Sequence, residues 1–348
     1  MSSLLYWVLA VLMFGVIIML HELGHFWAAR ATGVGVMEFA VGMGPKIWSR
    51  KAKSGVVYSL RALPLGGFCR FVGEEEDGQA DRPDAFVRQK VWKRALISVA
   101  GPLTNIITAF LMLMLLFWAV GLPIGAIPEV GGLLDGLPAE SAGIQVGDKL
   151  TGINGQAITT VEEASQLILT ADGGEIALSL ERDGEPVTIR VTPQWVEEEQ
   201  RAMIGIEYVQ GAPVRFPLGE SLGYAVSTTG EMSVTIVRLL GELVFKGEGM
   251  EDLTGPIGTV ALIRDQTEQG GIYSYLNLAA LISINLAVFN LIPIPGLDGS
   301  KLIFLALEKI RGKRLNPQKE GLVTLIGLAL MMGVMFFAIY QDIMRLAQ

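Results

Sequence analysis

The sequence predicts a polytopic α-helical membrane protein with four transmembrane helices and one α+β domain inserted between the second and the third. Four long blocks of the chain carry no charged residue, and short β-rich runs with polar turns separate the second block from the third. Hydrophobic residues make up 51% of the 348 residues even without glycine, which exceeds the usual share in soluble domains. These features favour a membrane protein over a large soluble protein with buried core helices.

The four uncharged blocks are the predicted membrane spans. Each approaches or exceeds the roughly 20 residues that a helix needs to cross the hydrocarbon core. The first block follows a segment without Lys or Arg and leads directly into His21 and Glu22 rather than into a small-residue cleavage site. We therefore expect it to be retained rather than removed as a signal peptide. The blocks cover residues 4–20, 95–127, 276–297 and 322–340.

Charged residues predict the orientation of these spans. Lys and Arg are concentrated in residues 30–94 and 301–319, whereas the long segment between them contains three consecutive glutamates at 197–199. Because positively charged loops stay in the cytoplasm, we expect a bacterial inner-membrane protein with both termini and the inserted domain outside the cytoplasm. The net charge of −8 argues against a nucleic-acid partner. Cys69 is the single cysteine, which excludes an internal disulfide.

The basic segment after the first span predicts a β-hairpin. Residues 56–60 have the pattern of a strand, Pro64 and Gly66-Gly67 favour a turn, and residues 68–71 alternate between apolar and polar.

The inserted segment predicts a small domain of mixed strands and helix. We expect a helix over residues 161–170 and strands over residues 176–180 and 187–191. The predicted division of the whole chain is then 1–126, 127–211 and 212–348.

The last third of the chain predicts a further helix and two irregular stretches. Residues 218–247 favour a helix that lies at the membrane surface, and residues 248–272 favour a glycine-rich loop around Gly255-Pro256. Residues 290–299, at the end of the third block, contain two prolines and two glycines, which preclude a regular helix there.

Two histidines in the first span form the pattern of a zinc site. His21 and His25 are four residues apart, so on a helix they project from the same face. Such a pair can share one zinc ion, with the intervening Glu22 as general base. Ionisable residues in an apolar span are costly and usually functional. The alternative is a chance arrangement at the end of a helix.

A catalytic zinc ion takes three protein ligands and leaves one position for water. The chain has no other histidine, so the third ligand must be Cys69 or a carboxylate. Asp298 is the favoured candidate because broken backbone at membrane depth is tolerated only where it is buried in protein or lines a cavity. An ordinary turn at the membrane surface is the alternative for this stretch.

Two further patterns resemble known families. Residues 138–150 and 153–155, which read Pro-Ala-Glu-Ser-Ala-Gly-Ile-Gln-Val-Gly-Asp-Lys-Leu and Ile-Asn-Gly, resemble a PDZ domain of the circularly permuted bacterial kind. With the His-Glu-x-x-His motif and the Asn-x-x-Pro-x-Pro-x-Leu-Asp-Gly stretch at 290–299, nearly the whole chain resembles the site-2 protease family, in its regulator-of-sigma-E branch. The best-known Gram-negative members carry two PDZ domains and this chain has one, so we carry over no size-filtering mechanism.

This resemblance implies an enzyme and assigns roles to residues. It implies an intramembrane metalloprotease in which Zn²⁺ is bound by His21, His25 and Asp298, with Glu22 as catalytic base. The hairpin corresponds to a re-entrant β-loop that presents substrate by strand pairing. The residues expected near the substrate are Gly66, Gly67, Phe68, Asn105 and Asn290.

The expected partners follow from the same resemblance. They are the lipid bilayer, single-span membrane proteins of the anti-sigma-factor or remnant-signal-peptide type, and an extracytoplasmic peptide at the PDZ domain. Two alternatives stay open at this point. One is an inactive membrane scaffold that recruits peptides through the PDZ domain and needs no zinc. The other is a membrane-anchored protease that cuts soluble peptides outside the bilayer.

Overall fold

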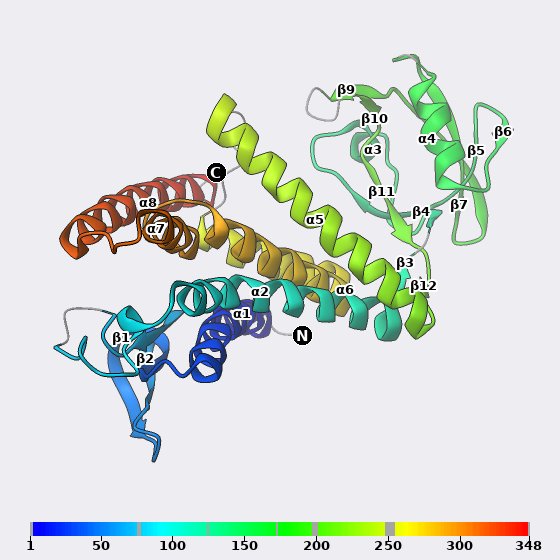
Figure 1. The fold of residues 1–348 in the computed structure, drawn as a ribbon. Coiled ribbons are helices and arrows are strands. Elements are labelled where there is room, and N and C mark those ends of the chain that lie inside the picture. Colours follow the sequence, from blue (N-terminus) through cyan, green and yellow to red (C-terminus); the bar gives the residue numbers. More distant parts are fainter. Residues whose placement is uncertain are drawn as a thin grey trace. The chain divides into compact units, whose positions relative to one another are not determined.

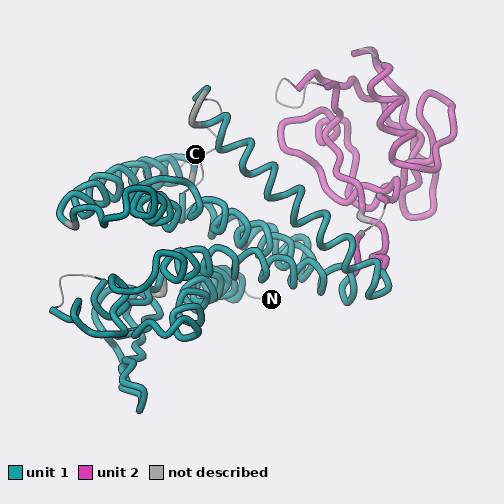
Figure 2. The backbone as a smooth tube through the Cα atoms, viewed as in Figure 1, with its two compact units in different colours: residues 1–120, 216–348 teal, residues 121–215 magenta. Residues whose placement is uncertain are grey.

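A computed structural model of the chain describes residues 3–74, 78–123, 125–171, 173–196, 201–247 and 255–346. The chain forms two compact units (Figure 2). The helical unit comprises residues 1–120 and 216–348, and the inserted domain comprises residues 121–215. The boundaries of the inserted domain predicted from the sequence, residues 127 and 211, stay a prediction.

Four helices of the helical unit correspond to the predicted spans (Figure 1). They are the helices among the described residues that are long and apolar enough to cross a membrane. The second ends earlier than predicted, because five residues of π-helix at 116–120 follow it and the chain then enters a strand at Leu122. The four are α1 (Ser3–Thr32), α2 (Val91–Leu115), α6 (Pro256–Leu291) and α8 (Pro317–Leu346).

Helix α1 packs against α2 and α6. Its Gly24 lies so close to α2 that an added Cβ would collide with the carbonyl oxygen of Ala100. Further along, Ile17 is buried with Ile263 and Ala279 of α6. Small residues at the α1–α2 crossing let the two backbones approach closely, as is common where helices pack within membranes.

The predicted loop at residues 248–272 is wrong for its second part, because α6 already begins at Pro256. Proline is well suited to the first position of a helix. The buried carboxylate of Asp342, in α8, accepts hydrogen bonds from the amides of Gly255 (3.0 Å) and Gly258 (2.8 Å), which satisfies this helix start. Gly271, with φ of 58°, kinks the helix. Residues 248–254 lie outside the described part of the chain.

The hairpin consists of β1 (Val36–Lys51) and β2 (Val57–Phe71), which pair antiparallel. The predicted turn at Pro64 and Gly66-Gly67 is wrong, because β2 continues through it. The observed turn lies at residues 52–56. The predicted strands pair with residues before this turn: Val57 faces Lys51, and Phe71 faces Val36. The preceding strand was missed because its apolar residues do not alternate regularly.

The remaining helices of this unit are α5 (Leu218–Lys246) and α7 (Asp298–Arg311). Helix α5 packs on α2 and α6, with Ser221, Ala225 and Thr229 buried at four-residue spacing. The predicted break in the third span is confirmed, since residues 292–297 are not helical and α7 starts immediately after them. Asp298 is therefore the first residue of α7 rather than part of a span.

The inserted domain is built on a mixed set of short strands and two short helices, α3 (Pro138–Ser141) and α4 (Val161–Leu169). A six-stranded sheet has the order β11-β4-β5-β7-β8, with β6 beside β5. The predicted helix is confirmed as α4, which Thr160 and Glu163 start with a reciprocal capping box. The predicted strands are confirmed as β7 and β8. The sheet strands are β4 (Ala126–Leu133), β5 (Lys149–Ile153), β6 (Gln156–Ala157), β7 (Ile176–Arg182), β8 (Glu185–Val191) and β11 (Ile206–Gln210).

Two further strand pairs complete the domain. A short pair joins β3 (Leu122–Pro123) to β12 (Pro213–Val214) where the chain enters and leaves the domain. The other joins β9 (Gln194–Val196) to β10 (Arg201–Met203). Leu178, Leu180 and Val130 lie in the fully buried core of the domain, which gives it a hydrophobic core of its own.

Candidate metal centre

The side chains of His21 and His25 meet that of Asp298, more than 270 residues further along the chain, at the start of α7. Nε2 of His21 and Nε2 of His25 each lie 3.2 Å from Oδ2 of Asp298, and the two nitrogens lie 3.2 Å from each other. Both histidines are buried. Helix α1 places the histidines one turn apart on one face, and the broken segment before α7 turns Asp298 towards them.

This donor set fits a zinc ion. Ligand atoms at about 2.0–2.1 Å from a tetrahedral zinc lie about 3.3–3.4 Å apart, close to the three distances of 3.2 Å. Among the described residues these three form the group of His, Cys, Asp and Glu side chains that is close enough to hold a metal ion. Two imidazoles and one carboxylate are a common ligand set of catalytic zinc, which leaves a fourth position for water.

The other ring nitrogens of the histidines are held by α2. Nδ1 of His25 lies 2.7 Å from the carbonyl oxygen of Ile97, so it carries the proton and leaves the Nε2 lone pair for a metal. The buried amide nitrogen of Asn105 lies 3.4 Å from Nδ1 of His21, while its carbonyl oxygen has no partner in the described structure. Turning the amide over would let this oxygen accept the Nδ1 proton, which satisfies both groups.

Gly101 of α2 keeps the metal position open. A Cβ added to Gly101 would collide with Nε2 of His25 and would lie 2.9 Å from Nε2 of His21. The close approach of α2 to α1 thus depends on Gly24 from one helix and Gly101 from the other. No side chain larger than that of glycine fits at residue 101 without displacing the histidines.

A cavity of about 290 Å³ lies over the three ligand atoms. Glu22 and Asn290 line it, and so do Phe68 and Cys69 of β2. Strand β2 comes close to Glu22, because a Cβ on Gly67 would lie 3.2 Å from Cγ of Glu22. A carboxylate, a metal position and an extended backbone therefore share one cavity.

Lys301, one turn along α7 from Asp298, also lines this cavity. Its ammonium group lies 2.8 Å from Oε1 of Glu74. The negative charge of Glu74 raises the pKa of Lys301, so the side chain stays protonated. Lys301 adds a fixed positive charge at the edge of the cavity.

The structure brings together most of the predicted site residues, but not all of them. His21, Glu22, His25, Asp298, Phe68 and Asn290 meet at the cavity, and Gly67 lies beside Glu22. Asn105 contacts His21 and does not line the cavity. Gly66 packs against Met43 instead. Cys69 lines the cavity but does not belong to the metal-binding group, so Asp298 and not Cys69 lies with the histidines.

Sequence reasoning missed Gly101 as a site residue, and it also missed Lys301 and Glu74. In the segment that begins at Gly101 and Pro102, only Asn105 was predicted to lie near the substrate. The spacing of Lys301 from Asp298, three residues on a helix, could have indicated it. Nothing in the local sequence around Glu74 connects it to a residue more than 200 positions away.

Comparison with known proteins decides the family. The model of peptidase family M50 matches residues 9–334, which is most of the chain. This chain belongs to peptidase family M50. Members of this family are zinc-dependent, so the protein is a zinc metalloendopeptidase of the site-2 protease type. Its four candidate spans and its relatives indicate a multi-pass protein of the inner membrane.

Two curated relatives resemble this chain over nearly their whole length. Zinc metalloprotease RasP of Bacillus licheniformis is 31% identical, and the alignment covers 97% of this chain and 98% of the relative. Regulator of sigma-W protease RasP of Bacillus subtilis is 29% identical, with 97% of each chain covered. A crystal structure of a PDZ domain of an SdrC-like protein from Listeria monocytogenes is 21% identical with a TM-score of 0.22, and it covers 23% of this chain and 85% of its own.

Proposed function

We propose that His21, His25 and Asp298 bind the zinc ion, that Glu22 is the catalytic base, and that the enzyme cleaves transmembrane segments of single-span membrane proteins. Substrates of the anti-sigma-factor or remnant-signal-peptide type fit this activity. The observation that carries the proposal is the triangle of three ligand atoms, each 3.2 Å from the others, inside a cavity that Glu22 lines.

The chemistry divides between the metal and the side chains. When bound, zinc supplies a Lewis acid that polarises a peptide carbonyl and acidifies water. The carboxylate of Glu22 accepts the proton of the attacking water and passes it to the leaving amine nitrogen. The Ile97 carbonyl and Asn105 hold the imidazoles of His25 and His21 in position, which matters because such outer contacts tune metal affinity.

Strand β2 supports a role in substrate presentation. A helical substrate hides its carbonyl groups in its own hydrogen bonds, so it must become extended before hydrolysis. The backbone of β2 passes Glu22 at Gly67, where an extended peptide could pair with it. Exposed apolar side chains on the hairpin fit the proposal that it re-enters the membrane; they are Met43, Ile47, Trp48, Leu60 and Leu63.

The inserted domain supports a second binding step. A cavity of about 250 Å³ lies between α4 and residues 201–206, and it is lined by apolar side chains such as Ile168 and Met203. The adjacent strand β11 lies at one edge of the six-stranded sheet. These features fit a PDZ domain that binds an extracytoplasmic peptide by strand addition. We place this domain and both termini outside the cytoplasm, with the metal centre towards the cytoplasmic side.

Replacement of Glu22 by glutamine tests the catalytic proposal. The amide keeps the size of the side chain but cannot accept a proton, so we expect unchanged zinc content and a loss of cleavage by at least about 10²-fold. The measurement is cleavage of a purified single-span substrate in detergent, with zinc determined by elemental analysis. Glu231→Gln, at an exposed position of α5, is the control. Cleavage at the normal rate by Glu22→Gln would disprove the role of this residue.

A further inference from the structure

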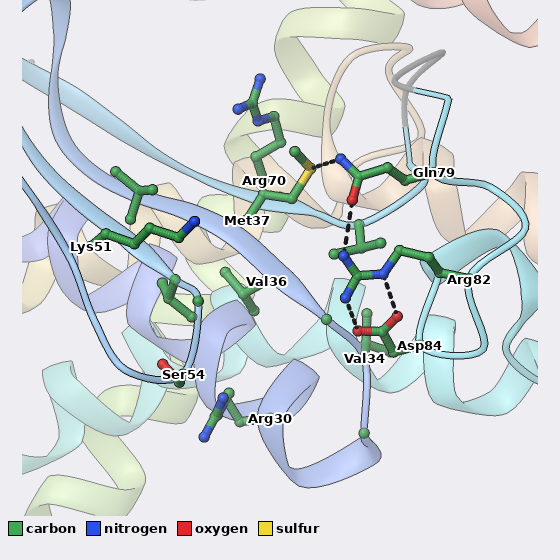
Figure 3. A pocket seen from close by; sticks show the side chains of 16 residues that line it. Arg30, Val34, Val36, Met37, Lys51, Ser54, Arg70, Gln79, Arg82 and Asp84 are labelled. Carbon is green, nitrogen blue, oxygen red and sulfur yellow. Dashed lines mark hydrogen bonds and ion pairs between the residues drawn. The ribbon is translucent and has the colours of Figure 1, made fainter.

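A second cavity, of about 480 Å³, lies at the end of α1 and away from the metal centre (Figure 3). It is lined by the last turn of α1, by both strands of the hairpin and by the loop that carries Arg82 and Asp84. Its size is within the usual range of ligand pockets. We define the basic pocket by four side chains that line it: Arg30, Lys51, Arg70 and Arg82.

Two of the four cations of the basic pocket have no ion-pair partner among the described residues. Arg82 is neutralised by Asp84, with two hydrogen bonds of 2.9 and 2.8 Å. Among the described residues, neither Arg30 nor Lys51 forms an ion pair. Figure 3 shows Lys51 and Arg82 on opposite sides of the hollow, with Arg30 on α1 below them. Several cations around one cavity repel each other unless an anion joins them.

Arg70 adds an unsatisfied donor. Its guanidinium group lies 3.7 Å from Glu38, and its buried Nε–H has no acceptor in the described structure. Ser59 donates to Oε1 of Glu38 at 2.7 Å, and two other cations lie 3.0 Å from the same oxygen, whereas Arg70 faces Oε2. Although burial opposes ionisation, these partners lower the pKa of Glu38 to about 2. The carboxylate is thus ionised and balances part of the charge of Arg70, while the Nε–H of Arg70 stays without an acceptor in the described structure.

The end of α1 that lines the basic pocket has the features of a boundary between membrane and water. Arg30 is in the last turn of α1, a candidate membrane span that ends at Thr32. The ammonium group of Lys93 donates to the carbonyl oxygen of Thr32 at 2.7 Å, so α2 starts where α1 ends. Two tryptophans, Trp27 on α1 and Trp92 on α2, are exposed at this same end. Exposed tryptophans are typical of the boundary between hydrocarbon and water.

We propose that the basic pocket binds a phosphate-bearing anion, namely the headgroup of an anionic phospholipid of the surrounding membrane. Basic pockets beside transmembrane helices are typical binding places for such headgroups. The ligand would contact α1 and both strands of the hairpin at once. The charge of the bound lipid would therefore influence the position of strand β2, which passes Glu22 at Gly67. A free phosphate compound has the same chemistry and is the alternative source.

Lipid binding by the full-length protein tests this proposal. The protein in detergent is titrated with phosphatidylglycerol or phosphatidylcholine, and bound lipid is counted by native mass spectrometry. We expect phosphatidylglycerol to bind at least about tenfold more tightly. Arg30→Gln combined with Lys51→Gln should weaken it roughly thirtyfold, because each basic residue near an anionic surface contributes about fivefold. Lys53→Gln is the control, since Lys53 lies two residues after Lys51 but does not line the pocket.

Two further measurements, on a variant that keeps the charges and with soluble competitors, distinguish the possible explanations of a change in lipid binding. Arg30→Lys combined with Lys51→Arg should retain binding, which distinguishes loss of charge from loss of fold. Inorganic phosphate and glycerol 3-phosphate are added as soluble competitors. Displacement of the lipid by either at equal concentration would overturn the headgroup assignment in favour of a soluble phosphate. Equal binding of the two lipids, or an equal loss in Lys53→Gln, would overturn the proposal of a built site.

Discussion

At the residue scale, each of the two histidines has one ring nitrogen directed to Asp298 and the other directed to α2. His25 meets the carbonyl oxygen of Ile97 and His21 meets Asn105. A ring fixed at both nitrogens has one tautomer and one orientation, which lowers the cost of ordering it when a metal binds. The close approach of α2 is therefore a property of the metal centre as much as of the fold.

Gly101→Ala tests that dependence. The added methyl group would meet the metal-facing nitrogens of both histidines, so we expect zinc affinity to fall by more than about tenfold while the helices remain folded. Zinc competition with a chelator gives the affinity, and circular dichroism gives the helix content. Gly230→Ala is the control, because nothing lies within 4 Å of a Cβ added there. Full zinc affinity in Gly101→Ala would contradict the described crossing of the helices.

At the element scale, the inserted domain depends on a buried carboxylate next to its helix α3. Asp148 is 1% exposed and accepts hydrogen bonds from Nε (2.7 Å) and Nη2 (2.8 Å) of Arg182 and from the amide of Gln145 (2.9 Å). The bonds from Arg182 lower the pKa of Asp148, against the effect of burial. The ionised form thus ties the strand β7 to the loop that precedes β5.

Asp148→Asn removes this charge and leaves Arg182 without its main partner. We expect the free energy of unfolding of the domain to drop by about 1.5–3 kcal/mol at neutral pH. Because the pKa is lowered in the folded state, the contribution is complete above about pH 4 and is lost as the pH falls further. The difference between wild type and variant should therefore shrink in acid. Urea unfolding of residues 121–215, followed by circular dichroism at several pH values, measures it.

The exposed Asp135 of the same domain provides the comparison, as Asp135→Asn should change the unfolding free energy by less than about 0.5 kcal/mol. An Asp148→Asn penalty that stays constant down to pH 2 would show that the carboxylate charge is not what stabilises the loop.

At the scale of the whole molecule, the two units have separate cores, and the chain passes between them at residues 120–121 and 215–216. Ile17 is buried with Ile263 in the helical unit, and the inserted domain has its own buried cluster around Leu178. The two ends of the inserted domain lie close together, since the amide of Gly211 donates to the carbonyl oxygen of Gly125 at 2.8 Å. The metal-binding group lies entirely within the helical unit.

Replacement of residues 126–210 by a short Gly-Ser linker should therefore leave the metal centre intact. The ends to be joined are already adjacent, so the linker adds little closure entropy. We expect one zinc ion per chain and unchanged helix content in detergent, as measured by elemental analysis and circular dichroism. If zinc and helix content are both lost, the helical unit does not fold independently of the inserted domain.

Local patterns predicted much of this architecture. The four spans and the break before Asp298 follow from runs of apolar residues and from prolines, which act over a few neighbouring positions. The helix at Val161 was also predicted, and the structure shows that a local capping pair starts it. The pairing of the hairpin was mispredicted, because strand partners depend on residues farther along the chain. The helix start at Pro256 was missed because Asp342, more than 80 residues away, supplies the acceptor.

The sequence by itself determined that His21, Glu22 and His25 share a helical turn inside an apolar span, and that a third ligand must come from Cys69 or a carboxylate. Only the tertiary structure separates those candidates in space, since it brings Asp298 to 3.2 Å from both histidines while Cys69 stays on the cavity wall. It also revealed the place of Gly101 and of the basic pocket. The physical reason is that helical spacing is a local property, whereas contacts between α1, α2 and α7 depend on how their surfaces pack.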